Sequence, residues 1–403
     1  MKFSASILES LKARKPEYSL SQRFYTDPEL FDLEMELIFA QSWLAIGHVC
    51  EVPKAGDYVT VNVGKDSLLI VRNQEGGIGA FFNTCRHRGS VLCTKASGSA
   101  PKIVCPYHQW TYELDGQLIF AREMASDFDK ADFPLNKVNV EVAGGTIYVC
   151  LSDNPPDFSE YARSIEPYIA PHGMDDLKVA AEISIVEQGN WKLVWENNRE
   201  CYHCQAGHPS LLRSLPESDD PNDPVTTPEA KAHMEQAFSA WEQKDLPYRA
   251  VNKNGWRIAR MPLVKGAVSM TMDGQPAVKN HRLGTLPDID VGTLRNLHLP
   301  NVWLHYQADH CISFRVLPIS PQETQLTCKW MVPKDAVEGV DYDVDNLTKV
   351  WRDTNDEDRS FVERNQLGIN SRAYKPGPYS PTAEFGVKAF IDWYTDRMIE
   401  KLS

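Results

Sequence analysis

Two short segments of the chain carry four potential metal ligands. They read CRHRG and CPYHQWTY, and they contribute Cys85 with His87 and Cys105 with His108. A structural zinc ion accepts two cysteines and two histidines in a tetrahedron, so zinc is one interpretation of this set. Each segment, however, supplies one thiolate and one imidazole, which suits a cluster in which the thiolates bind one iron and the imidazoles the other. The spacing therefore favours a [2Fe–2S] cluster, and Gly89 is expected to allow the tight turn of the first loop.

The charge and composition exclude several classes of partner. The net charge is −13, so we expect no nucleic-acid partner, because phosphate backbones repel an acidic surface. No segment approaches the ~20 apolar residues of a membrane span, and the N-terminus lacks a long apolar stretch of signal-peptide type. The nine cysteines are an odd number and are scattered. We therefore expect no membrane partner, reduced thiols and a cytoplasmic location.

A chain of 403 residues is long for one core, so two domains are expected. Residues 1–45 are predicted to be a helical segment that packs on the C-terminal domain. Short alternating apolar runs separated by turns predict an all-β domain over residues 46–155. The mixed pattern of residues 156–403 predicts an antiparallel sheet covered by long helices, which makes the fold class α+β. The acidic, Pro-rich stretch over residues 216–231 is predicted to be a surface loop.

A second group of potential ligands follows in NWKLVWENNRECYHCQAGH. We expect one helix through this stretch, with Glu200 and His203 on one face and His208 shortly after. Two such imidazoles can coordinate one ion. One alternative is a partly buried pair of histidines, and another is a zinc site at Cys201 and Cys204. These two cysteines are expected to point away from the histidines, which disfavours zinc.

Two histidines need a third ligand, and a carboxylate would complete the facial triad of mononuclear non-haem Fe(II) oxygenases. Such a triad leaves positions open for O₂ and substrate. The segment WRDTNDEDRSFVERNQLG offers several carboxylates, although a run of acids is more often a solvated helix face. The candidates are Asp353, Asp356, Glu357, Asp358 and Glu363. Spacing alone does not choose among them.

Both groups together resemble the catalytic α subunits of Rieske non-haem iron oxygenases, and the resemblance covers essentially the whole chain. It implies a Rieske [2Fe–2S] domain followed by a helix-grip-like catalytic domain. Cys85, His87, Cys105 and His108 would then hold the cluster. His203 and His208 would bind the mononuclear Fe(II), with Asp358 as the third ligand and Asp356 as the second choice.

A narrower resemblance is to the branch that oxidises quaternary ammonium compounds, the glycine betaine monooxygenases and proline betaine demethylases. It is carried by WENNRECYHC, FRVLPISP and NQLGINSRAYKPGPYSPTAEFGVKAFIDWY. It implies hydroxylation of an N-methyl group, with glycine betaine as the first candidate substrate and proline betaine as the second. A Rieske oxygenase of an aromatic or other ring substrate is the alternative. A non-catalytic electron carrier or structural zinc protein is more remote.

The partners follow from the same resemblance. O₂ would be the co-substrate, and NAD(P)H would be oxidised by a separate flavin and iron–sulfur reductase, since EGGIGAFF lacks the spacing of a dinucleotide-binding loop. The resemblance also implies a head-to-tail homotrimer, in which electrons cross between subunits. Glu200 would bridge His203 of its own subunit and His108 of the next. Alternatively, it only orients His203.

A trimethylammonium group has no proton to donate, so aromatic faces would have to recognise it through cation–π contacts. Buried aromatic side chains mainly serve core packing, which is the competing interpretation. The candidates for such a cage are Trp303, Tyr306, Phe390 and Trp393.

Overall fold

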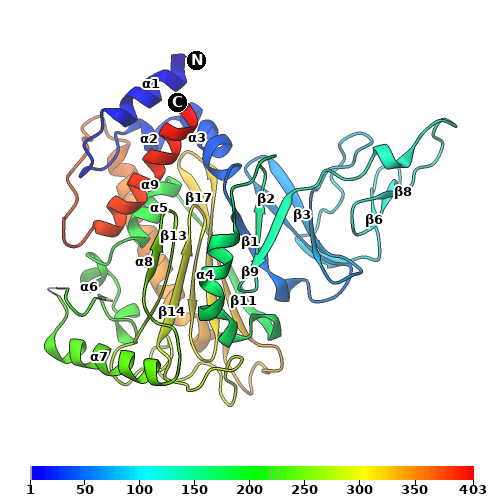
Figure 1. The fold of residues 1–403 in the computed structure, drawn as a ribbon. Helices are drawn as coiled ribbons and strands as arrows, with labels where there is room; N and C mark the ends of the chain where they lie inside the picture. Colours follow the sequence, from blue (N-terminus) through cyan, green and yellow to red (C-terminus); the bar gives the residue numbers. More distant parts are fainter. Residues whose placement is uncertain (1, 219, 224) are drawn as a thin grey trace. The chain divides into compact units, whose positions relative to one another are not determined.

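The computed structural model describes residues 2–218, 220–223 and 225–403 (Figure 1). The chain forms two compact units: Phe39–Ala162, and residues up to Ile38 together with Arg163–Ser403. One unit is built of strands and the other is mixed, so the predicted α+β class is confirmed. The acidic stretch predicted to be a surface loop is not helical over its described residues up to 227, but residues 228–231 begin a helix instead. Positions 219 and 224 of this stretch lie outside the described residues.

The smaller unit consists of antiparallel sheets, in the orders β1-β10-β9, β4-β3-β2-β5 and β6-β7-β8. Its strands are β1 (Leu44–His48), β2 (Asp57–Val63), β3 (Asp66–Arg72), β4 (Ile78–Phe82), β5 (Ser97–Ser99), β6 (Ile103–Val104), β7 (Thr111–Tyr112), β8 (Leu118–Phe120), β9 (Asn139–Ala143) and β10 (Thr146–Cys150). The two predicted metal loops follow β4 and connect β6 to β7. Each loop therefore starts from a strand that is anchored in a sheet.

The larger unit contains a seven-stranded antiparallel sheet in the order β11-β17-β16-β15-β14-β13-β12. These strands are β11 (Leu177–Glu187), β12 (Val251–Lys253), β13 (Trp256–Met261), β14 (Thr293–His298), β15 (Val302–Tyr306), β16 (Cys311–Ser320) and β17 (Glu323–Pro333). In β15, Trp303 and His305 lie on one face and Tyr306 on the other, because side chains alternate along a strand. The register pairs Trp303 with Phe314 of β16, so these two side chains share a face.

Helices cover the sheet of the larger unit, with α5, α8 and α9 close to one another (Figure 1). The helices of the chain are α1 (Lys2–Lys12), α2 (Arg23–Thr26), α3 (Pro28–Glu34), α4 (Ser159–Ile169), α5 (Trp191–Asn198), α6 (Cys204–Gly207), α7 (Pro228–Gln243), α8 (Val344–Ile369) and α9 (Phe385–Leu402). Asp27 caps the start of α3, since its side chain accepts hydrogen bonds from the backbone N–H groups of Glu29 and Leu30.

A buried ion pair joins α3, α5 and α9. Lys192 Nζ lies 2.7 and 2.9 Å from the two carboxylate oxygens of Glu34, and both side chains are almost completely buried. Trp191 and Tyr394 also donate hydrogen bonds to Glu34, at 2.8 and 2.5 Å. A buried carboxylate with this many donors is fully compensated, so the pair holds the start of α5 in one position.

The single helix expected through residues 190–206 is not observed. Helix α5 ends at Asn198, and the chain makes a separate turn before the short α6 begins at Cys204. The side chain of Glu200 accepts hydrogen bonds from the backbone N–H groups of Tyr202 and His203. Such local side-chain bonds compete with helical hydrogen bonds, and they close the turn instead. Glu200 and His203 still lie together, but through this turn and not through a helix face.

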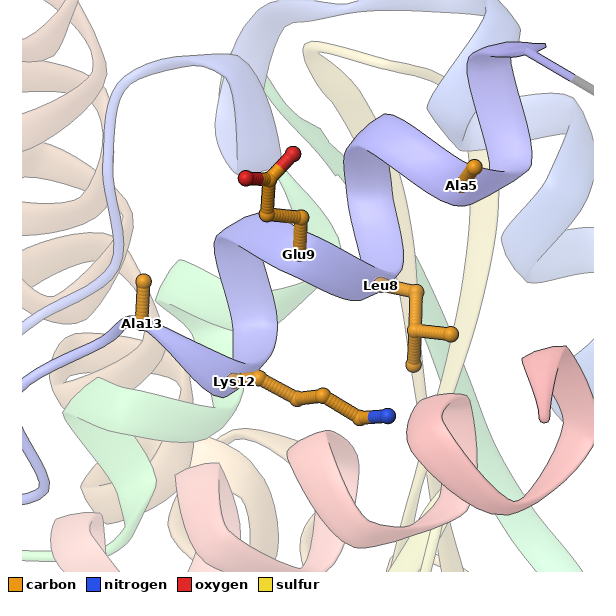
Figure 2. Close-up of a pocket in the computed structure, with 5 residues that line it drawn as sticks. All are labelled: Ala5, Leu8, Glu9, Lys12 and Ala13. Carbon is orange, nitrogen blue, oxygen red and sulfur yellow. The ribbon is translucent and has the colours of Figure 1, made fainter.

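An open depression on α1 is lined by Ala5, Leu8, Glu9, Lys12 and Ala13 (Figure 2), and none of the predicted site residues borders it. Among the residues that the structure describes, no helix is both long and apolar enough to cross a membrane.

Candidate metal centres

The two loops of the smaller unit share one backbone design. In each loop the carbonyl of the cysteine accepts a hydrogen bond from the N–H four residues later, at 3.0 Å in both cases. The N–H of each cysteine donates to the carbonyl five residues later, at 2.9 Å for Cys85 and 2.8 Å for Cys105. The fourth residue after the cysteine has positive φ in both loops, +75° at Gly89 and +60° at Gln109. The expected turn at Gly89 is present, while its counterpart Gln109 has no sequence signal, because non-glycine residues rarely adopt this conformation.

The four predicted ligands meet at the tips of these loops. The thiols of Cys85 and Cys105 are buried, and the rings of His87 and His108 lie with their centroids 4.6 Å apart. Nδ1 of His87 is buried and has no hydrogen-bond partner among the described residues. A buried polar atom without a partner requires an explanation, and an iron ion bound to this nitrogen provides one.

Two aromatic residues support the loops, and the sequence analysis missed both. The hydroxyl of Tyr112 lies 3.4 Å from Cys85 Sγ and accepts the N–H of Arg86 at 3.2 Å. Trp110 stacks on His87 with ring centroids 4.7 Å apart. The sequence signal that could have identified them is their position, since Trp110 and Tyr112 directly follow the second pair of ligands. Burial raises the pKa of the Cys85 thiol, so a thiolate here needs a nearby positive charge, which iron supplies.

In the larger unit, three ligand atoms from two distant segments converge. Nε2 of His203 and Nε2 of His208 lie 2.9 Å apart. Oδ1 of Asp358, on α8, lies 2.9 Å from His208 Nε2 and 3.4 Å from His203 Nε2. An ion about 2.1 Å from three ligands at about 90° to one another requires ligand atoms about 3 Å apart. The spacing therefore fits one face of an octahedral ion.

The opposite ring nitrogens of both histidines are held by carboxylates. His203 Nδ1 lies 2.5 Å from Glu200 Oε1, and His208 Nδ1 lies 2.8 Å from Glu357 Oε2. Carboxylates in this position orient a metal-binding imidazole and increase its basicity. Burial lowers the pKa of His203, but hydrogen bonds with Asp358 and Glu200 outweigh it and raise the pKa to about 9.

The five carboxylates that spacing left open have different surroundings. Asp353 accepts a hydrogen bond from Ser210, Asp356 pairs with Arg359 on the surface, and Glu363 accepts the N–H of Gln188. Glu357 contacts the outer nitrogen of His208. Asp358 is the one whose oxygen faces the inner nitrogens of both histidines, and the side chain of Asn197 also donates to it at 2.5 Å.

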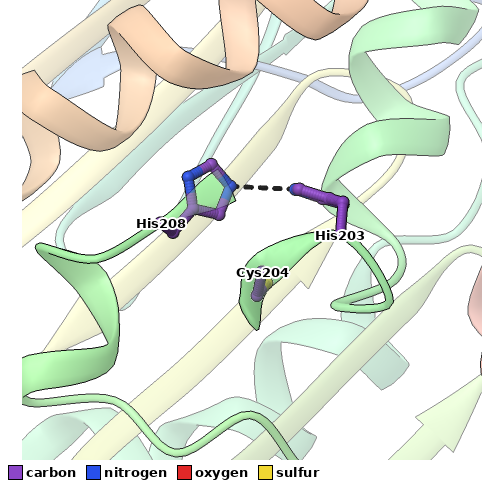
Figure 3. Close-up of side chains that lie close together, drawn as sticks. All are labelled: His203, Cys204 and His208. Atoms are coloured by element: carbon purple, nitrogen blue, oxygen red, sulfur yellow. Dashed lines mark hydrogen bonds between the residues drawn. The ribbon is translucent and has the colours of Figure 1, made fainter. Parts of the chain in front are cut away.

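The cysteines beside His203 differ from the expectation in two ways. Cys201 and Cys204 form a disulfide, so the expectation that all thiols are reduced is wrong for this pair. The turn between α5 and α6 brings their Cα atoms to 4.9 Å, which is within bonding reach. Cys204 Sγ also does not point away: it and one nitrogen each of His203 and His208 lie within 4.8 Å of one another (Figure 3).

The four predicted cage aromatics do not form one group. Trp303 contacts Trp195 and stacks on Phe314, with ring centroids 5.2 and 5.0 Å away. Tyr306 lies on the opposite face of the sheet, where its ring centroid is 5.3 Å from that of His172. Phe390 and Trp393, both on α9, stack on each other, and Phe390 also stacks on Trp195.

The aromatic group around Trp303 also includes a residue that the sequence analysis missed. Trp351 packs against Phe314 and His305, at 4.7 and 4.8 Å between ring centroids. It precedes Asp358 by seven residues on α8, which is about two helical turns, so both side chains share one side of the helix. The signal that could have identified it is this helical spacing.

Comparison with known proteins identifies the family. The family described as "Ring hydroxylating alpha subunit (catalytic domain)" matches residues 174–400, and "Rieske [2Fe-2S] domain" matches residues 42–140. The chain is 52% identical over 397 residues to the glycine betaine monooxygenase oxygenase subunit of Chromohalobacter salexigens, covering 98% of this chain and 89% of the relative. It is 50% identical to the protein of that name from Pseudomonas aeruginosa, covering 98% and 92%.

A solved quaternary ammonium Rieske monooxygenase in complex with gamma-butyrobetaine has the same fold, with a TM-score of 0.71 at 22% identity over 97% of this chain and 98% of the other. The chain belongs to the Rieske ring-hydroxylating oxygenases and is an enzyme of that family. Its cofactors are a Rieske [2Fe–2S] cluster and a mononuclear iron, which the two groups of ligand residues described above fit.

Replacing Asp358 by alanine should remove the mononuclear iron and leave the cluster. The iron content should fall from about three to about two per chain, because two histidines alone hold Fe(II) weakly. Turnover should be lost, while the visible spectrum of the cluster should remain. Asp356→Ala is the matched control: its side chain pairs with Arg359 on the surface, so iron content and turnover should be retained. Iron analysis with both variants measures the difference, and the reverse result would show that Asp356 is the ligand.

Proposed function

We propose that this protein is the terminal oxygenase of a monooxygenase that hydroxylates an N-methyl group of glycine betaine. The product loses formaldehyde and leaves dimethylglycine. The observation that carries the proposal is the identity of about half of all residues, along nearly the whole chain, with relatives named glycine betaine monooxygenase oxygenase subunits. Proline betaine is the second candidate substrate.

The iron ligands are proposed to be His203, His208 and Asp358, with cluster ligands Cys85, His87, Cys105 and His108. When bound, the cluster supplies electrons and the mononuclear iron activates O₂ for transfer of one oxygen atom to the methyl group. These three side chains would hold the iron from one side and leave its other side open for O₂ and substrate. Glu200 and Glu357 keep the rings of the histidines turned toward the ion.

The trimethylammonium group is proposed to lie against the aromatic group of Trp303, Phe314 and Trp351. These rings come from the sheet and from α8, the helix that carries Asp358. All three side chains are almost fully buried and in contact with one another, so the cation is proposed to lie against an outer face of the group, where little water competes for it. A cation over an aromatic face in such a desolvated place gains about 2 kcal/mol.

The electrons are proposed to come from a separate reductase that oxidises NAD(P)H, because a relative that this chain matches over its length is named an oxygenase subunit. In a head-to-tail homotrimer, Glu200 would connect His203 to His108 of the neighbouring subunit. The carboxylate of Glu200 already binds His203 Nδ1 at 2.5 Å. His108, the other end of this connection, is partly exposed at its loop tip.

The substrate assignment is tested by formaldehyde release. The purified oxygenase, supplied with a surrogate reductase, NADH and O₂, should release formaldehyde from glycine betaine in an amount equal to the dimethylglycine formed. Proline betaine should be the next best substrate, while choline, which lacks a carboxylate, and aromatic hydrocarbons serve as comparisons. Hydroxylation of an aromatic ring without release of formaldehyde from any methylated amine would overturn the proposal.

The role of Glu200 is tested by Glu200→Gln. The amide retains an oxygen for the turn but loses the charge, so both metal sites should stay filled and the cluster should still be reduced. Reoxidation of the cluster by O₂ with substrate present should slow by orders of magnitude in stopped-flow measurements.

Glu357→Gln is the matched control, because it removes the equivalent carboxylate from the other histidine. An electron-path role predicts a much larger effect for Glu200→Gln than for Glu357→Gln. If Glu200 only orients His203, both variants should bind iron more weakly and recover with excess Fe(II). Wild-type reoxidation in the iron-loaded Glu200→Gln variant would remove this residue from the electron path.

A further inference from the structure

Two sulfur atoms lie beside the proposed iron site, and the proposed oxygenase chemistry uses neither. Cys201 and Cys204 flank His203 and are joined by a disulfide. Cys204 Sγ, one ring nitrogen of His203 and one ring nitrogen of His208 all lie within 4.8 Å of one another (Figure 3). Cys204 is buried, so its sulfur faces the protein interior beside the histidines and not the solvent.

The oxidation state of this sulfur changes which metals the site can bind. A thiolate is a soft ligand that selects zinc, whereas a carboxylate oxygen with two histidines is the set of non-haem Fe(II) sites. A sulfur bonded to another sulfur has no thiolate charge and is a poor ligand. The disulfide therefore leaves Asp358, 2.9 and 3.4 Å from the two histidine nitrogens, as the nearest third ligand.

The distances allow the reduced sulfur to reach the ion. A tetrahedral zinc ion with bonds of about 2.0 Å to nitrogen and about 2.3 Å to sulfur needs nitrogen and sulfur about 3.5 Å apart. The sulfur lies within 4.8 Å of the histidine nitrogens while it is bonded to Cys201. Once the disulfide is reduced, rotation about the Cα–Cβ bond of Cys204 allows its sulfur to move by more than the remaining distance of about 1.3 Å.

We propose that Cys201 and Cys204 form a redox switch that sets the metal preference of the site. As a dithiol, Cys204 supplies a thiolate that binds zinc together with His203 and His208. As a disulfide, the sulfur is withdrawn, and Asp358 completes the iron-binding set. The inference rests on the proposed function, in which these two histidines bind the catalytic iron.

Hydrogen peroxide is the proposed oxidant that converts the dithiol into the disulfide. Two S–H bonds break and one S–S bond forms, which releases two protons and two electrons. One hydrogen peroxide molecule accepts both and becomes two water molecules. Cys201 is only partly buried, so a peroxide or a reducing thiol reaches it before it reaches Cys204. Oxidation thus converts a zinc-binding protein into one that is ready for iron.

Two variants of the full-length protein separate the roles of the sulfurs. Cys201→Ser and Cys204→Ser both abolish the disulfide, but only Cys201→Ser keeps the thiol beside the histidines. Each protein, with its cluster in place, is dialysed without oxygen against equal amounts of Zn²⁺ and Fe²⁺, and bound metals are quantified. Relative to the oxidised wild type, Cys201→Ser should raise the ratio of zinc to mononuclear iron by about tenfold or more, because a thiolate joins the ligands. Cys204→Ser should not raise it.

X-ray absorption at the zinc edge provides a readout that the cluster irons do not disturb. Zinc-loaded Cys201→Ser should show a sulfur neighbour at about 2.3 Å, and zinc-loaded Cys204→Ser should show only nitrogen and oxygen. Cys50→Ser, which changes a thiol of the other unit, should behave as the wild type. Equal metal ratios in the two main variants, or no sulfur neighbour in Cys201→Ser, would overturn the proposal.

If a variant does not fold, the wild type itself is compared after reduction and after treatment with peroxide. Titration should then find two more thiols in the reduced protein than in the peroxide-treated protein, and the reduced protein should bind more zinc relative to iron. If the ratio of zinc to iron is the same in both forms, the inference is overturned. A failure of the proposed function gives a different result. In that case the iron-loaded protein releases no formaldehyde, while its preference for zinc or iron still changes with the state of the disulfide.

Discussion

The proposed iron site of the larger unit depends on the close approach of helix α8 to the turn that carries His203 and His208. Gly207 lies directly under Phe361 of α8, and a Cβ at this position would be 2.8 Å from the phenylalanine ring. Gly189 makes a similar approach to Val362 of the same helix, where a Cβ would be 2.5 Å from a methyl carbon. Without side chains at these two positions, α8 comes near enough for Asp358 to meet both histidines.

The close approach of α8 to this turn gives the charged side chains of the site hydrogen-bond partners, which offset the free-energy cost of removing them from water. Asp358 is partly buried, and desolvation raises its pKa, but its hydrogen bonds with both histidines and Asn197 outweigh this effect and lower the pKa. Glu200 and Glu357 lie behind the histidines, on the sides away from Asp358. The arrangement is thus an alternation of carboxylate, imidazole and carboxylate, in which every buried charge has a partner. An Fe²⁺ ion at the centre would bind the two histidine nitrogens that face Asp358, and this binding requires both nitrogens to be unprotonated.

Much of this was predictable from the residues, and the part that was not has physical reasons. The four proposed cluster ligands could be singled out from the sequence because short loops place all four within eight residues of a strand. Asp358 could not be separated from Asp356 by spacing, since the choice depends on how α8 is rotated about its axis against a turn some 150 residues earlier in the chain. The predicted helix through Glu200 failed because hydrogen bonds of its own side chain close a turn there. Trp303 and Tyr306, by contrast, could have been separated from the start, because residues three apart in a strand point to opposite faces.

The central claim is that Fe(II) is held by ligands from two distant segments in a facial arrangement. Anomalous diffraction at the iron absorption edge, from crystals of the iron-loaded protein, tests it most directly. The account predicts a single iron peak about 2.1 Å from His203 Nε2, His208 Nε2 and an oxygen of Asp358, separate from the two-iron peak between the loops of Cys85 and Cys105. The account would be contradicted if the single iron peak lay elsewhere, or if Asp356 or Glu357 coordinated this iron in place of Asp358.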